Sequence, residues 1–325
     1  MEAADGAKLL YQNELGPEHM ISNEEDSMKR LVEEWESIPH SSSAFLAEPI
    51  GNRLVRVYLN SLSRKELPLL NTMFCQTANQ IKGSRERFIR HLDCLPLYFP
   101  QADNFLKEYK EKGYPAVSHS STYRTAYHPA YRVVTESHAG FLQLIRTINR
   151  HMQEKSPLII AIEGNCASGK TTLSSLFAAY FDCNIIHMDD FFLPLGLRTP
   201  SRLAQPGGNI HYERFAEEVM APLQNGSGVS FRRFCCGIMD YCSTVYQPSK
   251  PLTVIEGSYC MHPKLLPLYD YSVFLTCSYE RQIERIRTRN GEEMLKNFME
   301  KWIPMENQYF STFHVKEKCS FVIET

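Results

Sequence analysis

The stretch Leu158–Thr172, LIIAIEGNCASGKTT, decides how the second half of this 325-residue chain folds. Its apolar start, Leu158–Ile162, is typical of a buried strand. The loop that follows has Gly164, four further residues, and then Gly169-Lys170-Thr171. Glycines at this spacing let backbone N–H groups turn inward around phosphate oxygens, and the next helix presents its positive N-terminal end to them. The stretch therefore predicts a strand, a phosphate-binding loop (P-loop) and a helix.

Two side chains of the loop have expected roles of their own. Lys170 is expected to place its ammonium group near the β- and γ-phosphates of a nucleotide, and the Thr171 hydroxyl is expected to ligate Mg²⁺. ATP and Mg²⁺ are the predicted cofactors. The residues expected to hold the nucleotide are consecutive: Gly164, Asn165, Cys166, Ala167, Ser168, Gly169, Lys170, Thr171 and Thr172.

Composition excludes several classes of protein. Hydrophobic residues make up 43% of the chain, the net charge is −2, and no block of five or six basic residues occurs, which disfavours a nucleic-acid partner. No window approaches 18 uninterrupted apolar residues, so we expect neither export nor a membrane span. Ten cysteines, with Cys166 inside the loop, favour reduced thiols in a cytoplasm. Cys235, Cys236 and Cys242 lack metal-binding spacing and are expected to be packing residues.

The first part of the chain, residues 1–135, carries no motif with recognisable chemistry and is predicted to be a mainly helical domain of open role. Glu24–Trp35 has helical periodicity, and Arg53–Leu59 alternates as a half-buried strand does. Tyr114–Val134 has many tyrosines but weak periodicity, and is interpreted as an ordered connecting segment. The second domain is placed at residues 136–325.

Strand and helix patterns alternate from Leu158 onward. The predicted strands are Leu158–Glu163, Asn184–Met188, Leu252–Ile255, Tyr271–Thr276 and Phe321–Ile323. This alternation implies an α/β fold, with a parallel sheet that has helices on both faces. Ligands collect at the carboxyl ends of the strands in such sheets, so the polar residues after each strand are the candidates for a site.

Three acidic residues follow predicted strands, namely Asp189, Asp190 and Glu256. Phosphoryl transfer needs an oxygen ligand near Mg²⁺, and often a carboxylate that accepts the proton of the acceptor hydroxyl. Which of Asp189 and Asp190 would be that base stays open, since an acid at this point can also cap a helix. For His187, which precedes them, packing in the core is favoured over a part in the chemistry.

Arginines crowd a predicted helix late in the chain, at positions 281, 285, 287 and 289, before Asn290-Gly291. Arg285 and Arg289 are one turn apart and share a face. Alone, such a cluster is typical of a solvated helix face. In a chain with a phosphate loop it favours a lid, because a planar guanidinium group can hold two phosphate oxygens.

Together these stretches resemble the uridine kinase group of P-loop kinases, which has pantothenate kinase and phosphoribulokinase as relatives. The resemblance covers about residues 155–325. It is carried by EGNCASGKTT (163–172), IIHMDDFF (185–192), GGNIHYERFAEEVMAPL (207–223), VIEGSY (254–259) and ERQIERIRTRNG (280–291). The segment KWIPMENQYF (301–310) is similar to one in uncharacterised bacterial uridine-kinase-like proteins.

The resemblance implies an ATP-dependent kinase that phosphorylates a hydroxyl of a small nucleoside-like or sugar-like acceptor. By position, Asp189 is then the catalytic base, Lys170 contacts the phosphates, and Mg²⁺ lies near Thr171, Glu256 and Asp189. The lid residues implied are Arg285, Arg287 and Arg289, of which Arg285 and Arg289 are the predicted catalytic pair.

The acceptor side departs from the uridine kinase pattern and leaves the acceptor open. His211 stands where the group has an acid, Phe234-Cys235-Cys236 replaces a Tyr-Asp-aromatic triplet, and Phe192 replaces an aromatic hydroxyl. Pantothenate or a nucleotide could replace the nucleoside or sugar as acceptor. The sequence is also compatible with a nucleotide-binding regulator or assembly ATPase whose first domain binds a protein, and with a degenerate kinase that binds ATP without turnover. Oligomeric state has no signal in the sequence.

Overall fold

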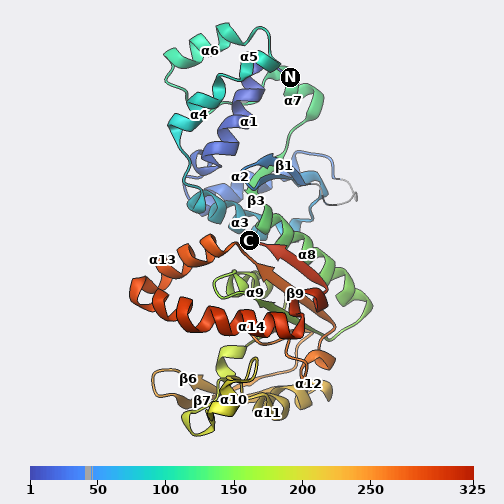
Figure 1. Cartoon of the computed structure of the whole chain (residues 1–325). Helices are drawn as coiled ribbons and strands as arrows, with labels where there is room; N and C mark the ends of the chain where they lie inside the picture. The colour runs from blue at the N-terminus through green and yellow to red at the C-terminus, as the bar shows by residue number, and fades with distance from the viewer. Residues whose placement is uncertain (41–44, 46) are drawn as a thin grey trace. The chain divides into compact units, whose positions relative to one another are not determined.

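The chain divides into two compact units in the computed structural model, which describes residues 1–40, 45 and 47–325 (Figure 1). The N-terminal unit is Met1–Gln143 and the P-loop unit is Leu144–Thr325. Helix α8 (Glu136–Glu154) contains the division: its first eight residues belong to the N-terminal unit and the rest to the P-loop unit.

The N-terminal unit is mainly helical, as predicted, and also holds an antiparallel sheet in the order β1-β2-β3. Its helices are α1 (Ala3–Leu15), α2 (Glu24–Glu36), α3 (Leu67–Gln80), α4 (Arg85–Leu92), α5 (Leu95–Tyr98), α6 (Ala102–Glu111) and α7 (Ser121–Tyr127). Its strands are β1 (Ala47–Gly51), β2 (Leu54–Tyr58) and β3 (Tyr131–Thr135).

The segment interpreted as a connection, Tyr114–Val134, instead contains α7 and most of β3. The first four residues of β3 are all buried, so the strand has no polar face and no alternating pattern that the sequence could reveal. The strand predicted at Arg53–Leu59 is confirmed as β2, but it is not half-buried. It forms the centre of the sheet and its first four residues are all buried, including Arg56.

The P-loop unit contains a five-stranded, fully parallel sheet in the order β10-β9-β4-β8-β5. The strands are β4 (Leu158–Gly164), β5 (Cys183–His187), β8 (Leu252–Glu256), β9 (Tyr271–Thr276) and β10 (Phe321–Glu324). The helices are α9 (Lys170–Tyr180), α10 (Pro200–Leu203), α11 (Tyr212–Phe215), α12 (Ala221–Gln224), α13 (Tyr279–Asn297), α14 (Ile303–Phe313) and α15 (Val315–Lys318). The predicted α/β fold with a parallel sheet is confirmed.

Register brings the ends of three neighbouring strands together. Glu256, the last residue of β8, lies opposite Ile162 of β4 on one side and opposite His187 of β5 on the other. Helix α9 packs on β4, β5 and β8. The start of the phosphate loop and the residues that follow β5 and β8 therefore meet at one edge of the sheet.

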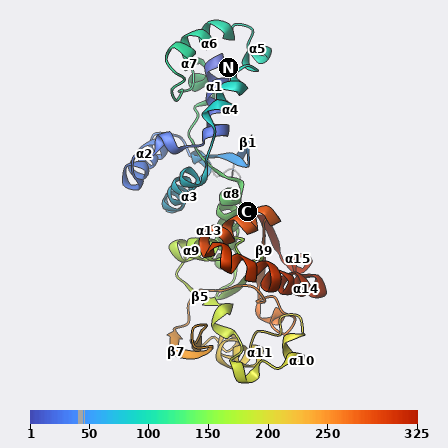
Figure 2. The ribbon, with the colours of Figure 1, turned by 60° about the vertical axis from the view of Figure 1, so that its left-hand side comes forward.

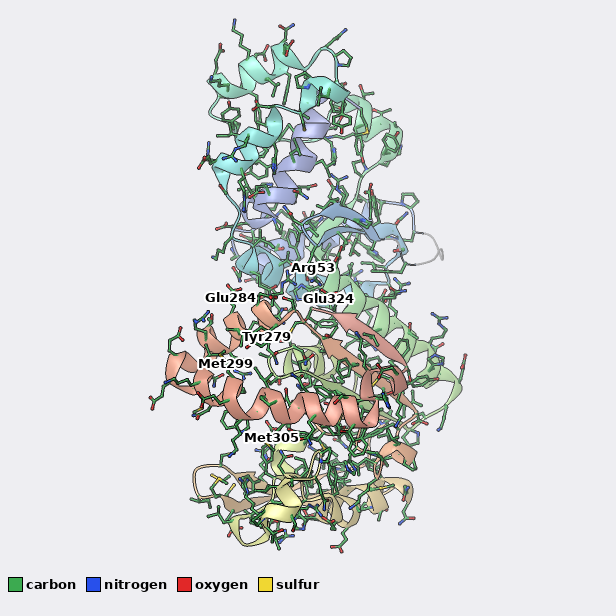
Figure 3. The ribbon with its side chains drawn as sticks, in the orientation of Figure 1. Arg53, Tyr279, Glu284, Met299, Met305 and Glu324 are labelled. Carbon is green, nitrogen blue, oxygen red and sulfur yellow. The ribbon has the colours of Figure 1, made fainter. Side chains whose placement is uncertain are left out.

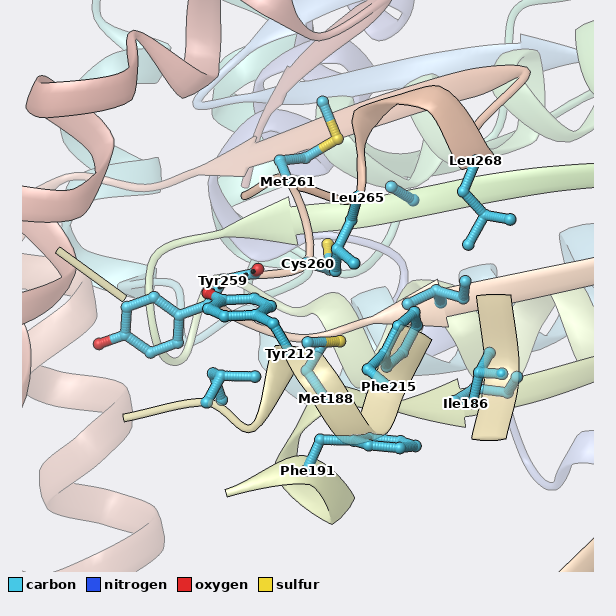
Figure 4. Packing of buried hydrophobic residues seen from close by; sticks show 14 of the residues in the cluster. Ile186, Met188, Phe191, Tyr212, Phe215, Tyr259, Cys260, Met261, Leu265 and Leu268 are labelled. Atoms are coloured by element: carbon cyan, nitrogen blue, oxygen red, sulfur yellow. Dashed lines mark hydrogen bonds between the residues drawn. The ribbon is translucent and has the colours of Figure 1, made fainter. Parts of the chain in front are cut away.

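A hydrophobic cluster supports that edge on one face of the sheet (Figure 4). Met188 and Phe191, which flank Asp189 and Asp190, are fully buried in it. Phe215 of α11 packs its ring against Phe191, with ring centroids 4.8 Å apart. The acidic turn after β5 is thus anchored by the apolar residues on either side of it.

The sequence patterns did not predict one hairpin: β6 (Val229–Cys235) and β7 (Asp240–Gln247) pair antiparallel and lie with α10 and α11 in both ribbon views (Figures 1 and 2). Cys236 at its turn and Cys242 on β7 are exposed, so the expectation that they pack in a core is wrong. The described residues include all ten cysteines, and each is a free thiol.

Within the described ranges, no helix is both long enough and apolar enough to cross a lipid bilayer.

Replacing Phe215 with alanine should destabilise the P-loop unit by about 3–5 kcal/mol, because it removes a fully buried ring and leaves a cavity. The chain has two tryptophans, Trp35 and Trp302, one in each unit. Urea unfolding followed by Trp302 fluorescence in a Trp35→Phe background measures the effect. Tyr246→Ala, at a side chain that is 69% exposed, is the control and should stay within about 0.5 kcal/mol. An equally small effect of Phe215→Ala would contradict the packing described.

Lowering the pH from about 6.5 towards 4 should destabilise the N-terminal unit. Burial lowers the pKa of His138 to about 4, so its ring stays neutral in the fold while the unfolded chain takes up a proton. The free energy of unfolding is highest above about pH 6.5, the pKa of histidine in the unfolded chain. Between that pH and the folded-state pKa of about 4, it falls by about 1.4 kcal/mol per pH unit for each such histidine.

The measurement is the urea midpoint of Trp35 fluorescence at several pH values, in a Trp302→Phe background. Burial lowers the pKa of His119 to about 4 as well, so His138→Gln should reduce the slope without abolishing it. The exposed His91 provides the control, and His91→Gln should leave the slope unchanged. A slope that His138→Gln does not alter would rule out this contribution.

Candidate nucleotide and phosphoryl-transfer site

The loop after β4 has the backbone that a phosphate cradle requires. Gly164 has a φ of +145°, and a Cβ there would lie 2.0 Å from the carbonyl oxygen of Leu275. Gly169, directly before α9, has a φ of +92°, and Ala167 between them has a φ of +60°. Left-handed residues alternating with right-handed ones form concave turns lined by N–H groups. Both glycines thus adopt backbone conformations that favour glycine over other residues.

Lys170 lies folded over this loop. Its Nζ donates to the carbonyl oxygens of Gly164 (2.7 Å) and Asn165 (2.9 Å) and to the Ser258 hydroxyl (3.3 Å). A lysine in this position places a compact positive charge with three N–H donors beside the loop. Carbonyl oxygens and a hydroxyl are neutral acceptors, so the ammonium group keeps its charge available for an anion.

A chain of hydrogen bonds joins the ends of β5 and β8 to the start of α9. The Thr171 hydroxyl donates to Glu256 Oε1 at 3.3 Å, and His187 Nδ1 lies 2.6 Å from the same oxygen. The hydrogen bond to Glu256 raises the pKa of His187 above its ordinary value, against the opposing effect of burial. The side chain of His187 is 41% exposed, so the expectation that it packs in the core is wrong.

Asp189 and Asp190 have different surroundings on the turn Met188–Phe191. Asp189 keeps exposed surface, yet enough protein surrounds its carboxylate for desolvation to raise its pKa, while the charge of Lys170 opposes the rise. Asp190 Oδ2 lies 3.8 Å from Arg233 Nε, and Arg214 donates to the Asp190 carbonyl oxygen. Of these two acids, Asp189 is therefore the one within electrostatic range of the P-loop lysine.

The two predicted catalytic arginines of α13, Arg285 and Arg289, make different contacts. Arg285 Nη1 donates to the carbonyl oxygen of Ala167 (3.1 Å) and to Thr325 Oγ1 (2.9 Å). Arg289 Nε donates to Asn290 Oδ1 at 2.8 Å instead. The structure thus brings Arg285 to the phosphate loop and leaves Arg289, the other predicted catalytic arginine, at the end of the helical turn before Gly291.

The helix that carries these arginines is broken where the sequence places Asn290-Gly291. Gly291 has φ +80° and ψ 170°, which is not helical. Arg287, beside the break, pairs with Glu292 at 2.5 Å across it. The break separates the part of α13 that contacts the loop from the part that leads to α14.

Two oxygen ligands, one at the end of β8 and one at the start of α9, fit Mg²⁺. Thr171 Oγ1 and Glu256 Oε1 lie 3.3 Å apart, close to the separation of about 3 Å between neighbouring ligands of an octahedral Mg²⁺ ion. In the described part of the chain no three His, Cys, Asp or Glu side chains converge as a metal cluster. Mg²⁺ sites built from one or two protein oxygens, waters and phosphates do not require such a cluster.

His211 and Phe234, two of the residues that depart from the uridine kinase pattern, both lie beside Tyr241. His211 Nδ1 lies 2.9 Å from the hydroxyl of Tyr241, and burial lowers the pKa of His211 below its ordinary value. The ring of Phe234 lies edge-on to those of Phe192 (6.0 Å) and Tyr241 (6.4 Å). The imidazole of His211 therefore lies beside a phenol hydroxyl and not beside a carboxylate partner on this hydrogen bond.

Sequence reasoning missed several residues that hold the loop. Glu163 is fully buried behind it, and burial raises the pKa of this residue to about 7 although Lys170 opposes the rise. Gln282 Nε2 donates to the carbonyl oxygen of Cys166, and Glu306 accepts from the Cys166 N–H. Glu306 lies in the segment KWIPMENQYF, which resembles a segment of other proteins. That resemblance does not reveal that Glu306 contacts Cys166.

Solved structures, including the following three, are similar to this chain over about half of its length, whereas no protein-family model and no curated protein matches the sequence. One is described as a possible uridine kinase from Bacillus stearothermophilus, with 17% identity, a TM-score of 0.43, and coverage of 55% of this chain and 96% of that one. The second is a candidate fructose transport system kinase from Silicibacter sp. TM1040, with 18% identity, a TM-score of 0.43, and coverage of 55% and 96%. The third, TT1252 from Thermus thermophilus, has 16% identity, a TM-score of 0.33, and coverage of 53% and 90%.

Proposed function

We propose that the P-loop unit is an ATP- and Mg²⁺-dependent kinase that phosphorylates a hydroxyl group of a small molecule. One observation carries the proposal: the ends of three adjacent strands gather Lys170, the Thr171–Glu256 pair and Asp189 around one left-handed glycine loop. A loop that binds phosphates, a hydroxyl–carboxylate pair and a separate acid are the parts that phosphoryl transfer requires.

Each part has a distinct task. The loop N–H groups and Lys170 bind the phosphates and stabilise the negative charge that develops in transfer. Asp189 orients the acceptor hydroxyl and accepts its proton, and desolvation raises the pKa of Asp189 towards the working range of a general base. Arg285, already on the loop, adds a guanidinium charge beside the transferred group.

Thr171 and Glu256 would hold Mg²⁺, which supplies charge neutralisation to the phosphates when it is bound. His187 keeps the Glu256 carboxylate oriented through its 2.6 Å hydrogen bond. Outer-sphere partners of this kind fix the direction of a ligand oxygen. His187 is thus assigned to positioning and not to proton transfer.

The acceptor is proposed to be nucleoside-like or sugar-like. Phe192, backed by the buried Phe234, offers a ring surface, and His211 and Tyr241 offer polar atoms, which suit a molecule with a flat or cyclic body and hydroxyl groups. Without an acid at His211, hydrogen bonding to the acceptor differs from that of a uridine kinase. Selectivity is sensitive to such buried polar contacts.

Asp189→Asn should abolish phosphoryl transfer with little loss of ATP affinity, because the amide cannot accept the proton but keeps the shape of the side chain. An ADP-release assay with acceptor, together with calorimetric ATP titration, checks both parts. A base of this kind contributes roughly 10²–10⁴-fold to the rate. Asp190→Asn is the matched control and should retain most of the activity, because Asp190 faces Arg233. Unchanged turnover in Asp189→Asn would remove Asp189 from its role.

The true acceptor should raise the unfolding temperature of the protein saturated with a nonhydrolysable ATP analogue. At 100 times its Kd a ligand adds about 2.7 kcal/mol of stability, so a thermal-shift panel of nucleosides, sugars, nucleotides and pantothenate can identify it. Lys170→Met provides the control, since it should lose the shift caused by the ATP analogue itself. Slow ATP hydrolysis that no small molecule stimulates would favour a nucleotide-dependent regulator instead.

A further inference from the structure

Helix α14 contacts the chain on both sides of Gly164 with two side chains that are three residues apart. Glu306 Oε2 accepts a hydrogen bond from the Cys166 N–H at 2.8 Å. The Tyr309 hydroxyl donates to Glu163 Oε2 at 3.1 Å, and Glu163 Oε1 accepts from the Gly164 N–H at 2.9 Å. Residues at i and i+3 share one helix face. Figure 3 shows Met305, the residue before Glu306, on this helix.

Glu306 is also linked to the P-loop lysine through one hydroxyl group. Ser258 Oγ donates to Glu306 Oε1 at 2.5 Å, and Lys170 Nζ donates to the same Ser258 oxygen at 3.3 Å. Ammonium, hydroxyl, carboxylate and loop N–H therefore form a continuous chain of hydrogen bonds. Glu306 is 5% exposed, so solvent does little to weaken these contacts.

The peptide groups of Cys166 are held from two helices at once. Glu306 of α14 binds the N–H, while Gln282 of α13 donates to the carbonyl oxygen at 3.0 Å. The side chains of Cys166 and Ala167 pack against a small cluster formed by Ile286, Leu295 and Ile303. The tip of the loop is therefore fixed by protein contacts before any nucleotide arrives.

We propose that Glu306 is a positioning residue for nucleotide phosphates: it fixes the third N–H of the loop directly and the Lys170 ammonium group through Ser258. A loop peptide and an ammonium group that are already held in place save the reorganisation that a loose loop would require. The inference rests on the proposed function, because it concerns the loop to which that function assigns ATP.

Alternatively, Glu306 could compete with the phosphates for the Cys166 N–H and so weaken nucleotide binding. The geometry disfavours it. If the phosphates took the Cys166 N–H, the Glu306 side chain, which is 5% exposed, would lose one of its hydrogen-bond donors without gaining water in its place. Tyr309, fully buried against Tyr259 with ring centroids 4.9 Å apart, also holds α14 in place.

Calorimetric titration of the full chain with Mg²⁺ and a nonhydrolysable ATP analogue tests the proposal. Glu306→Ala should weaken the analogue roughly ten- to hundredfold, the effect of losing a hydrogen bond to a charged group. Glu306→Gln should weaken it less, because the amide oxygen still accepts from Cys166. Glu300→Gln, at an exposed acid six residues earlier, is the matched control and should bind as the wild type does.

Thermal unfolding without nucleotide separates positioning from mere support. A purely structural role would lower the unfolding temperature of Glu306→Ala and leave the Kd of the folded protein unchanged, which would overturn the proposal. Tighter binding by either variant would overturn it in favour of competition. If Glu306→Ala does not fold, Glu306→Gln and Ser258→Ala test the proposal in its place. Both variants should bind the ATP analogue more weakly than the wild type, and unchanged binding by both would overturn the proposal. A wild-type protein that binds no ATP analogue would instead refute the proposed function itself.

Discussion

The close passage of Gly164 beside the carbonyl oxygen of Leu275 is the constraint on which the site depends. With no side chain at this point, β4 runs parallel to β9 up to its last residue and then turns into the loop. A Cβ at 2.0 Å from a backbone oxygen cannot be accommodated by a side-chain movement. The loop therefore begins at a fixed place and direction relative to the sheet, and the direction of α9 follows from it.

The register of the parallel strands also brings the site residues close together. Because β4, β8 and β5 are neighbours and parallel, side chains far apart in sequence reach one another with single hydrogen bonds: Glu256 bonds to Thr171, 85 residues away, and to His187, 69 residues away. Burial of Met188 and Phe191 holds the turn that carries Asp189 in place. Side chains of α13 and α14 pack against the phosphate loop. The rigidity of the site comes from the sheet and from these two helices together.

Much of this arrangement could be predicted because it is encoded locally. A recognisable sequence pattern marks the stretch at 158–172 and each strand of the parallel sheet. The acids that follow β5 and end β8 are also visible in the sequence. The hairpin β6–β7 and strand β3 could not be found this way, since one alternates only in part and the other is buried along most of its length. Glu306 had no local signal, because its partner Cys166 lies 140 residues away. The position of Arg289 depended on where α13 breaks, which spacing alone does not fix.

The break at Gly291 also bears on protein engineering. On one side of it Gln282 and Arg285 fasten α13 to the loop, and on the other Glu306 fastens α14. The chain between these attachments is largely exposed, and nothing lies within 4 Å of a Cβ built at Gly291. Extra residues inserted at this bend would extend into solvent without pulling on either attachment, so it is a suitable place for a purification tag or a fluorescent reporter.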